Sequence, residues 1–136
     1  MGLNNSSAKI CPENTILIAM YGQGKTRGMT ALLKTNASTN QACACILPSK
    51  EVNPYYLWNN LIFCYDDLRN QAKGGNQPNL NADIIKKYKV IIPPIELQNK
   101  FAEFVTHIEK LKSKLKDNIQ ELETLLASRM HHYFGE

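Results

Sequence analysis

The first half of the chain carries short apolar runs of the kind that form β-strands. Residues 15–20 (Thr-Ile-Leu-Ile-Ala-Met) are apolar and partly β-branched, and Pro12 and Gly22 bound them, which predicts a buried strand. Residues 43–47 predict a second strand that ends before Pro48. Between these runs, the glycine-rich residues 22–28 predict a loop.

Helical spacing replaces this pattern from residue 54. Asn53 is a suitable N-cap, and Pro54 would occupy the first helical position. The apolar residues then recur every three or four positions, namely Leu57, Trp58, Leu61, Ile62, Tyr65 and Leu68. We therefore expect a helix over residues 54–72, which Gly74 and Gly75 would terminate.

After this helix the pattern returns to short elements. The polar residues 76–81 predict a loop, and Asn81 can cap a short helical turn that ends at Lys86. Residues 88–92 predict a last strand, which Pro93 and the next proline close. Mixed strands and helices of this kind predict an α+β fold for a first domain, residues 1–93.

Residues 94–136 differ in kind, because a heptad pattern runs through them. Apolar residues alternate steps of three and four, with one polar residue in the remaining slot: Phe101, Phe104, Ile108, Leu111, Leu115, Asn118, Leu122 and Leu125. A helix of about 35 to 40 residues would be about 55 Å long, well beyond the size of the domain before it. We expect it to form a coiled coil with another long helix; folding back along its own domain is the alternative.

Charge and the remaining residue types narrow the functional class. Residues 1–93 contain ten Lys and Arg against five Asp and Glu, whereas residues 94–136 contain six against seven. This distribution suits a domain that faces a polyanion joined to an element that faces protein.

The sequence shows no membrane-spanning apolar run and no signal peptide, so we expect a cytoplasmic protein without membrane contact. The four cysteines lack a C-x2-C pair, and the adjacent His131 and His132 lack i, i+4 spacing, so no metal site is expected.

The strongest enzymatic alternative is a phosphate-binding loop. Gly24-Lys25-Thr26 follows an apolar strand, and only the first glycine of the G-x4-G-K-[ST] pattern is replaced, by Ala19. Asp66, which would be the magnesium-binding carboxylate, lies inside the predicted helix rather than after a strand. A nucleotide-binding core also needs several βαβ units of about 30 residues each. We therefore expect no catalytic residues and no cofactor.

Four segments follow one another along the chain: residues 16–28, the run Asn40-Gln41-Ala-Cys-Ala, the stretch from Tyr56-Leu57-Trp58 through Leu68-Arg69 to residues 74–81, and residues 90–98 with Pro93-Pro94 and Gln98. Together and in this order, they resemble the specificity subunit of type I restriction-modification systems. The resemblance covers residues 12–134. It matches the later part of one target recognition domain and one long spacer helix. The resemblance implies two such domains and two such helices in a whole subunit of this family.

This resemblance implies a protein that selects a DNA sequence and carries no catalytic machinery. Residues 1–93 would be a partial target recognition domain that binds one half of a bipartite double-stranded DNA target, and residues 94–136 a dimerisation and spacer helix. Partner modification subunits would bind S-adenosylmethionine and methylate adenine, and a restriction subunit would translocate and cut. The alternative is a helix-mediated interaction or regulatory fragment that pairs with a full-length specificity subunit without binding DNA.

Candidate DNA contacts combine positive charge, hydroxyls and amides in the two loops. They are Lys25, Thr26, Arg27, Lys73, Asn76, Gln77 and Asn79. The basic residues and Thr26 suit phosphates, and the three amides suit base edges. Two alternatives stay open: residues 22–28 could be a structural turn, and residues 74–81 could only pack the domain.

The heptad seam predicts dimerisation, either between two copies or with another specificity subunit. In an antiparallel pair, two copies would present two identical recognition halves to an inverted-repeat target. Asn118 would set the register of the paired helices.

Overall fold

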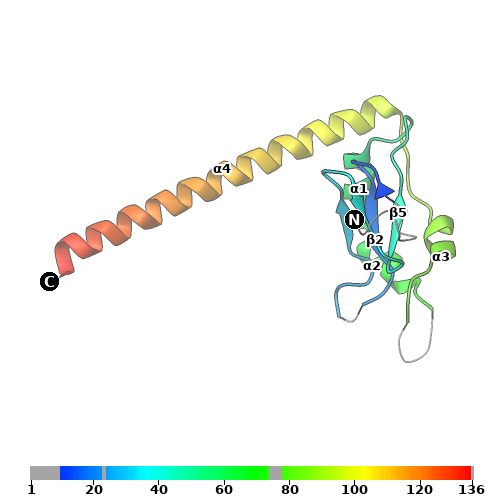
Figure 1. The fold of residues 1–136 in the computed structure, drawn as a ribbon. Helices are drawn as coiled ribbons and strands as arrows, with labels where there is room; N and C mark the ends of the chain where they lie inside the picture. Colours follow the sequence, from blue (N-terminus) through cyan, green and yellow to red (C-terminus); the bar gives the residue numbers. More distant parts are fainter. Residues whose placement is uncertain (1–9, 23, 74–77, 136) are drawn as a thin grey trace. The chain divides into compact units, whose positions relative to one another are not determined.

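The computed structural model describes residues 10–22, 24–73 and 78–135 (Figure 1). The chain forms two compact units, of which the first ends at Asn99 and the second begins at Lys100. The functional division into residues 1–93 and 94–136 stays a prediction. Small antiparallel sheets and short helices make up the described part of the first unit, which confirms the α+β fold class.

A three-stranded antiparallel sheet forms the centre of the first unit. Its order is β3 (Thr30–Leu32), β2 (Ile16–Ala19), β5 (Cys43–Ile46), so that β2 is paired on both edges. The two strands predicted at residues 15–20 and 43–47 are confirmed. A second, two-stranded sheet pairs β1 (Ile10–Cys11) with β4 (Ala37–Ser38).

The helix predicted over residues 54–72 is two helices, α1 (Pro54–Phe63) and α2 (Tyr65–Asn70). The backbone leaves the helical region at Cys64, where φ is −86° and ψ is 13°. The predicted N-cap is confirmed, because Asn53 Oδ1 accepts hydrogen bonds from the backbone N–H groups of the first turn. Asn81 caps α3 (Ala82–Lys87) in the same way, through the N–H of Ile84 at 2.8 Å.

The strand predicted at residues 88–92 is wrong. Tyr88 is extended, with φ −68° and ψ 125°, but the segment pairs with no described strand. Side-chain hydrogen bonds hold it instead. The Tyr88 hydroxyl donates to Asp67 Oδ2 at 2.8 Å, and the Tyr56 hydroxyl donates to the Ile91 carbonyl at 2.9 Å. Tyr88 is therefore extended without a strand partner among the described residues, and side-chain hydrogen bonds to α1 and α2, rather than a backbone ladder, hold the segment.

The core of the first unit lies between the three-stranded sheet and the helices α1 and α2. Its buried members are Ile16, Ile18, Leu32, Leu57, Leu61, Leu68 and Leu80. Burial of each such side chain contributes about 1.5–3 kcal/mol. Trp58 and Tyr88 pack against this cluster from its margin. The core thus fixes β2 against α2, the two elements that hold the candidate site.

The long helix α4 (Ile95–Phe134) has 40 residues, which confirms the predicted helix. The buried side chain of Gln98 anchors its first turn. Gln98 Oε1 accepts from the Asn53 N–H at 2.9 Å, and its Nε2 donates to the Pro93 carbonyl at 2.8 Å and to the Glu51 carbonyl at 3.3 Å. Among the described helices, none combines the length and apolar character that a membrane span requires.

Candidate nucleic-acid interface

The glycine loop, residues 22–28, connects β2 to β3. Three of its glycines adopt positive φ angles: 132° at Gly22, 59° at Gly24 and 85° at Gly28. Such angles are costly for residues with a Cβ, which explains the glycine-rich sequence. The base of the loop is closed by the Gly28 N–H, which donates to the Ala19 carbonyl at 2.9 Å.

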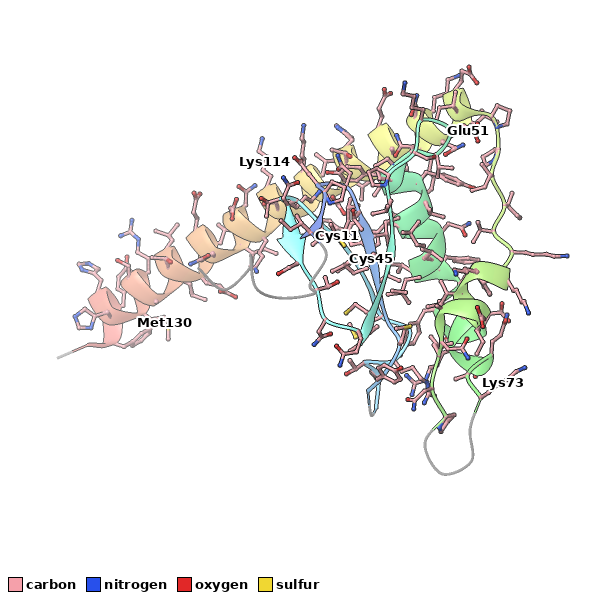
Figure 2. The ribbon with its side chains drawn as sticks, turned by 45° about the vertical axis from the view of Figure 1, so that its right-hand side comes forward. Cys11, Cys45, Glu51, Lys73, Lys114 and Met130 are labelled. Carbon is pink, nitrogen blue, oxygen red and sulfur yellow. The ribbon has the colours of Figure 1, made fainter. Side chains whose placement is uncertain are left out.

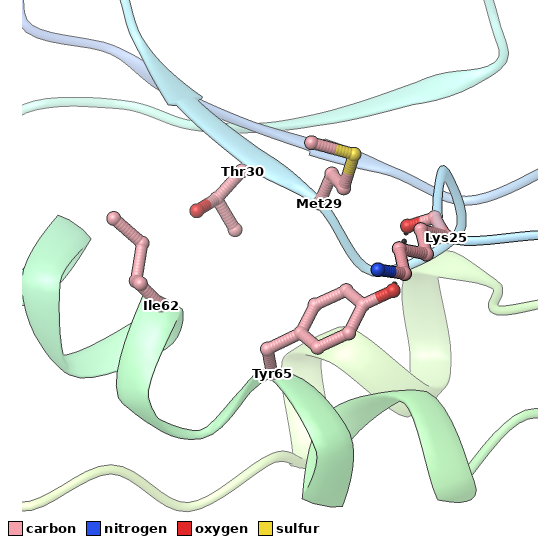
Figure 3. A pocket seen from close by; sticks show the side chains of 5 residues that line it. All are labelled: Lys25, Met29, Thr30, Ile62 and Tyr65. Atoms are coloured by element: carbon pink, nitrogen blue, oxygen red, sulfur yellow. Dashed lines mark hydrogen bonds between the residues drawn. The ribbon is translucent and has the colours of Figure 1, made fainter.

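Two side chains of α2 hold this loop from one side. The Tyr65 hydroxyl donates to the Lys25 carbonyl at 2.6 Å, a contact drawn in Figure 3. Arg69, one helical turn further, donates to the carbonyls of Gly24 and Arg27, the latter at 3.1 Å, and to the Tyr65 hydroxyl at 2.9 Å. Neither residue was a sequence candidate. Their i, i+4 spacing on a helix was visible, but nothing local indicated which loop they would meet.

Arg27 turns toward the second candidate loop. Its guanidinium Nη1 donates to the Pro78 carbonyl, and its buried Nε has no hydrogen-bond partner within the described chain. Lys25 and Thr26, by contrast, have exposed side chains. The structure therefore gives Arg27 a structural contact in addition to its predicted phosphate contact, which stays a prediction.

The second candidate loop lies between Lys73 and Asn79. An antiparallel β-bridge between these two residues closes it. The two residues exchange backbone hydrogen bonds of 3.1 and 2.9 Å. Lys73 is exposed and Asn79 is half-buried, whereas the candidates Asn76 and Gln77 lie outside the described residues. The Leu80 N–H donates to the Met20 carbonyl at 3.0 Å, which ties this loop to the end of β2.

The two candidate loops are therefore joined at the end of β2. The Arg27–Pro78 hydrogen bond links them directly. Figure 2 shows Lys73 at the opposite end of the first unit from Glu51, which lies beside the anchor of α4. The described candidates Lys25, Thr26, Arg27, Lys73 and Asn79 thus belong to one end of this unit.

An open pocket of about 430 Å³ adjoins the glycine loop. Lys25, Met29, Thr30, Ile62 and Tyr65 line it (Figure 3). Its wall is mainly apolar, with the lysine on the loop side. This lining offers contact surface and one positive charge, without a paired acid and base of the kind that general catalysis uses.

Two cysteines lie close together elsewhere in the described part of the first unit. Cys11 and Cys45 lie with their Sγ atoms 3.0 Å apart. The hydrogen bond to Cys45, together with burial, raises the pKa of the Cys11 thiol, which keeps it protonated and poorly nucleophilic. Among the described residues, no group of three His, Cys, Asp or Glu side chains could hold a metal ion.

The heptad positions of α4 form a separate surface in the second unit. All of them are exposed except Ile108, which is half-buried. The exposed fractions are 60% for Leu115 and 64% for Leu122. Residues three and four apart lie on one helix face, so these side chains form an apolar stripe along α4. A stripe of this length is unusual on a soluble monomer.

Two solved structures share this fold. One, described as the structural basis of complex assembly and conformational transition of the type I R-M system, matches with a TM-score of 0.67 and 16% identity over 88% of this chain and 29% of that chain. The other, the HsdS subunit from Thermoanaerobacter tengcongensis, matches with a TM-score of 0.63 and 15% identity over 81% of this chain and 25% of that one. This chain thus spans less than a third of the length of either.

The sequence itself matches a family whose description agrees with both structures. The match covers residues 1–124, which include the glycine loop, the second candidate loop and most of α4. The resemblance found in the four sequence segments is thereby confirmed. This chain belongs to the type I restriction modification DNA specificity domain family.

Proposed function

We propose that this chain recognises one half of a bipartite DNA target for a type I restriction-modification complex and docks the subunits that modify DNA. The observation that carries the proposal is the pair of joined loops at the end of β2, which present Lys25, Thr26 and Lys73 from one end of the first unit. Lysine ammonium and threonine hydroxyl groups are common phosphate ligands. The excess of basic residues in residues 1–93 favours the same polyanion.

Phosphate contacts can be counted by the salt dependence of binding. Each contact contributes about 0.9 to the slope of log K against log salt concentration on duplex DNA. We expect Lys25→Ala to lower this slope by about one contact, and Lys25→Ala with Lys73→Ala by about two. Arg27→Ala is a less selective probe, because it also removes the hydrogen bond to Pro78.

The assay is fluorescence anisotropy with a labelled target duplex and the chain assembled with its modification subunits. Lys50→Ala is the matched control, since Lys50 is an exposed lysine next to Glu51, at the other end of the first unit. Slopes that stay equal for Lys25→Ala and Lys50→Ala would remove the glycine loop from the DNA interface.

The exposed stripe of α4 supports a second part of the proposal, in which α4 pairs with the same helix of a second copy. Each buried leucine contributes about 1.5–3 kcal/mol, so several of them can offset the entropy lost on association. An antiparallel pair would present two recognition halves to one split target. Pairing with the helix of another specificity subunit uses the same stripe.

Leu122→Lys tests this pairing, because it places a charge within the stripe at an exposed heptad position. Gln120→Lys is the matched control: it adds the same charge at an exposed position outside the heptad seam. We expect the wild-type chain and Gln120→Lys to dimerise in light scattering across a dilution series, and Leu122→Lys to be monomeric. A wild-type monomer at every concentration would exclude self-pairing and leave the stripe to a different specificity subunit.

A further inference from the structure

Each backbone carbonyl of residues 24–27 in the glycine loop accepts a hydrogen bond. Gly24 and Arg27 accept from Arg69, and Lys25 accepts from the Tyr65 hydroxyl. The fourth carbonyl, that of Thr26, accepts from the Met29 N–H at 3.0 Å. Three of these four bonds therefore come from just two side chains of α2.

This arrangement matters for a loop that meets phosphate. A carbonyl oxygen carries partial negative charge and repels an anion, so a loop that contacts phosphate must turn its carbonyls away from it. Tyr65 and Arg69 fix three of them toward α2. The side chains of Lys25 and Thr26 stay exposed in the same conformation.

The two side chains also support each other. The Tyr65 hydroxyl accepts from Arg69 Nη1 at 2.9 Å while it donates to Lys25, so its proton is oriented by the arginine. The hydrogen-bond partners of Arg69 within the described residues are neutral carbonyls and a phenol, and its positive charge lies directly beside the loop. That charge favours an anion on the loop's outer side.

We infer that Tyr65 and Arg69 are positioning residues of the DNA interface: they hold the glycine loop in the conformation that presents Lys25 and Thr26 to a phosphate. The inference rests on the proposed phosphate contact of this loop. Both residues act through the backbone and touch no DNA themselves.

Tyr65→Phe is the sharpest test, because it removes one hydroxyl and changes no charge. Tyr55→Phe is the matched control: its hydroxyl lies on α1 and accepts from Lys34 rather than holding the loop. Two quantities are measured, namely hydrogen exchange of the amides at residues 24–28 in the full chain, and the dissociation constant of the assembled complex for duplex DNA across a salt series.

We expect Tyr65→Phe to speed exchange in the loop and to weaken DNA binding about threefold to tenfold, the effect of one hydrogen bond. The salt slope should stay at the wild-type value, because the charge of Lys25 is still present. Arg69→Lys should weaken binding as well, since a lysine keeps the charge but loses the fork that reaches two carbonyls. Tyr55→Phe should match the wild type in both measurements.

Two results would overturn the inference. One is a dissociation constant for Tyr65→Phe equal to that of Tyr55→Phe. The other is full binding by Arg69→Lys together with a reduced salt slope for Arg69→Gln, which would make Arg69 a direct phosphate ligand. Failure of the proposed function looks different, because there Lys25→Ala itself leaves the salt slope unchanged.

Discussion

Replacing Gln98 with alanine removes a set of buried hydrogen bonds within the first unit. The side chain is fully buried and makes three hydrogen bonds to backbone groups from two other segments of the chain. The substitution therefore leaves the Asn53 N–H without its acceptor and the Pro93 carbonyl without its donor.

The expected loss of stability follows from these contacts. An orphaned buried donor or acceptor costs about 1–3 kcal/mol, and the 3.3 Å bond to Glu51 adds little. Allowing for partial relaxation, we expect Gln98→Ala to lower the free energy of unfolding by about 2–4 kcal/mol. At about 4–8 °C per kcal/mol for a domain of this size, the melting temperature should fall by about 10 °C or more.

Tryptophan fluorescence isolates the unit concerned, because Trp58 is the single tryptophan and lies on α1. Asn99→Ala is the control: Asn99 Oδ1 accepts from Asn53 Nδ2 at 2.8 Å on the exposed surface, where the loss should stay below about 1 kcal/mol. If Gln98→Ala and Asn99→Ala melt at the same temperature, the reasoning about buried backbone partners is wrong.

Two further predictions concern alkaline pH and the glycine loop. A hydrogen bond to the Cys45 thiol, together with burial, raises the pKa of Cys11. Burial, together with a hydrogen bond to the Asp67 carboxylate, raises the pKa of Tyr88. Both groups hold their proton more tightly in the folded state, so the free energy of unfolding should fall as pH rises past their ordinary pKa values of 9.0 and 10.0. Urea unfolding measured across this pH range should show a smaller fall for Tyr88→Phe than for the wild type. In the glycine loop, Gly22→Ala should lower the melting temperature more than Gly24→Ala does. A Cβ at Gly22 would lie 2.8 Å from Thr26 Cβ, whereas a Cβ at Gly24 would meet nothing within 4 Å among the described atoms. Equal melting temperatures for the two variants would contradict this steric argument.

Local signals explain which elements the sequence predicted. The caps at Asn53 and Asn81 and the helical spacing of residues 94–136 are read from neighbouring residues, and both caps and the long helix were confirmed. Pairing through the heptad seam stays a prediction. The strands β1, β3 and β4 were missed, because they have two or three residues each and exist only through pairing with other strands. The wrong strand at residues 88–92 had the right composition, but its described contacts are side-chain hydrogen bonds to α1 and α2 rather than backbone pairing with a strand.

Part of the candidate site could be predicted from local sequence, and part of it could not. The glycine loop could be found from its sequence, since positive φ angles demand glycine. Tyr65 and Arg69 could not, because their contacts join residues about 40 positions apart and depend on how α2 lies beside the glycine loop. The structural contact of Arg27 with Pro78 was hidden for the same reason.

Both loops of the candidate interface are hydrogen-bonded to the end of one short strand, β2, or to the residue after it. The Ala19 carbonyl receives the base of the glycine loop, and the Met20 carbonyl receives the segment after the second loop. Ile16 and Ile18, buried on one face of β2, hold that strand in register. A genetic screen for lost target recognition should therefore recover substitutions at these two buried isoleucines beside substitutions at the exposed Lys25.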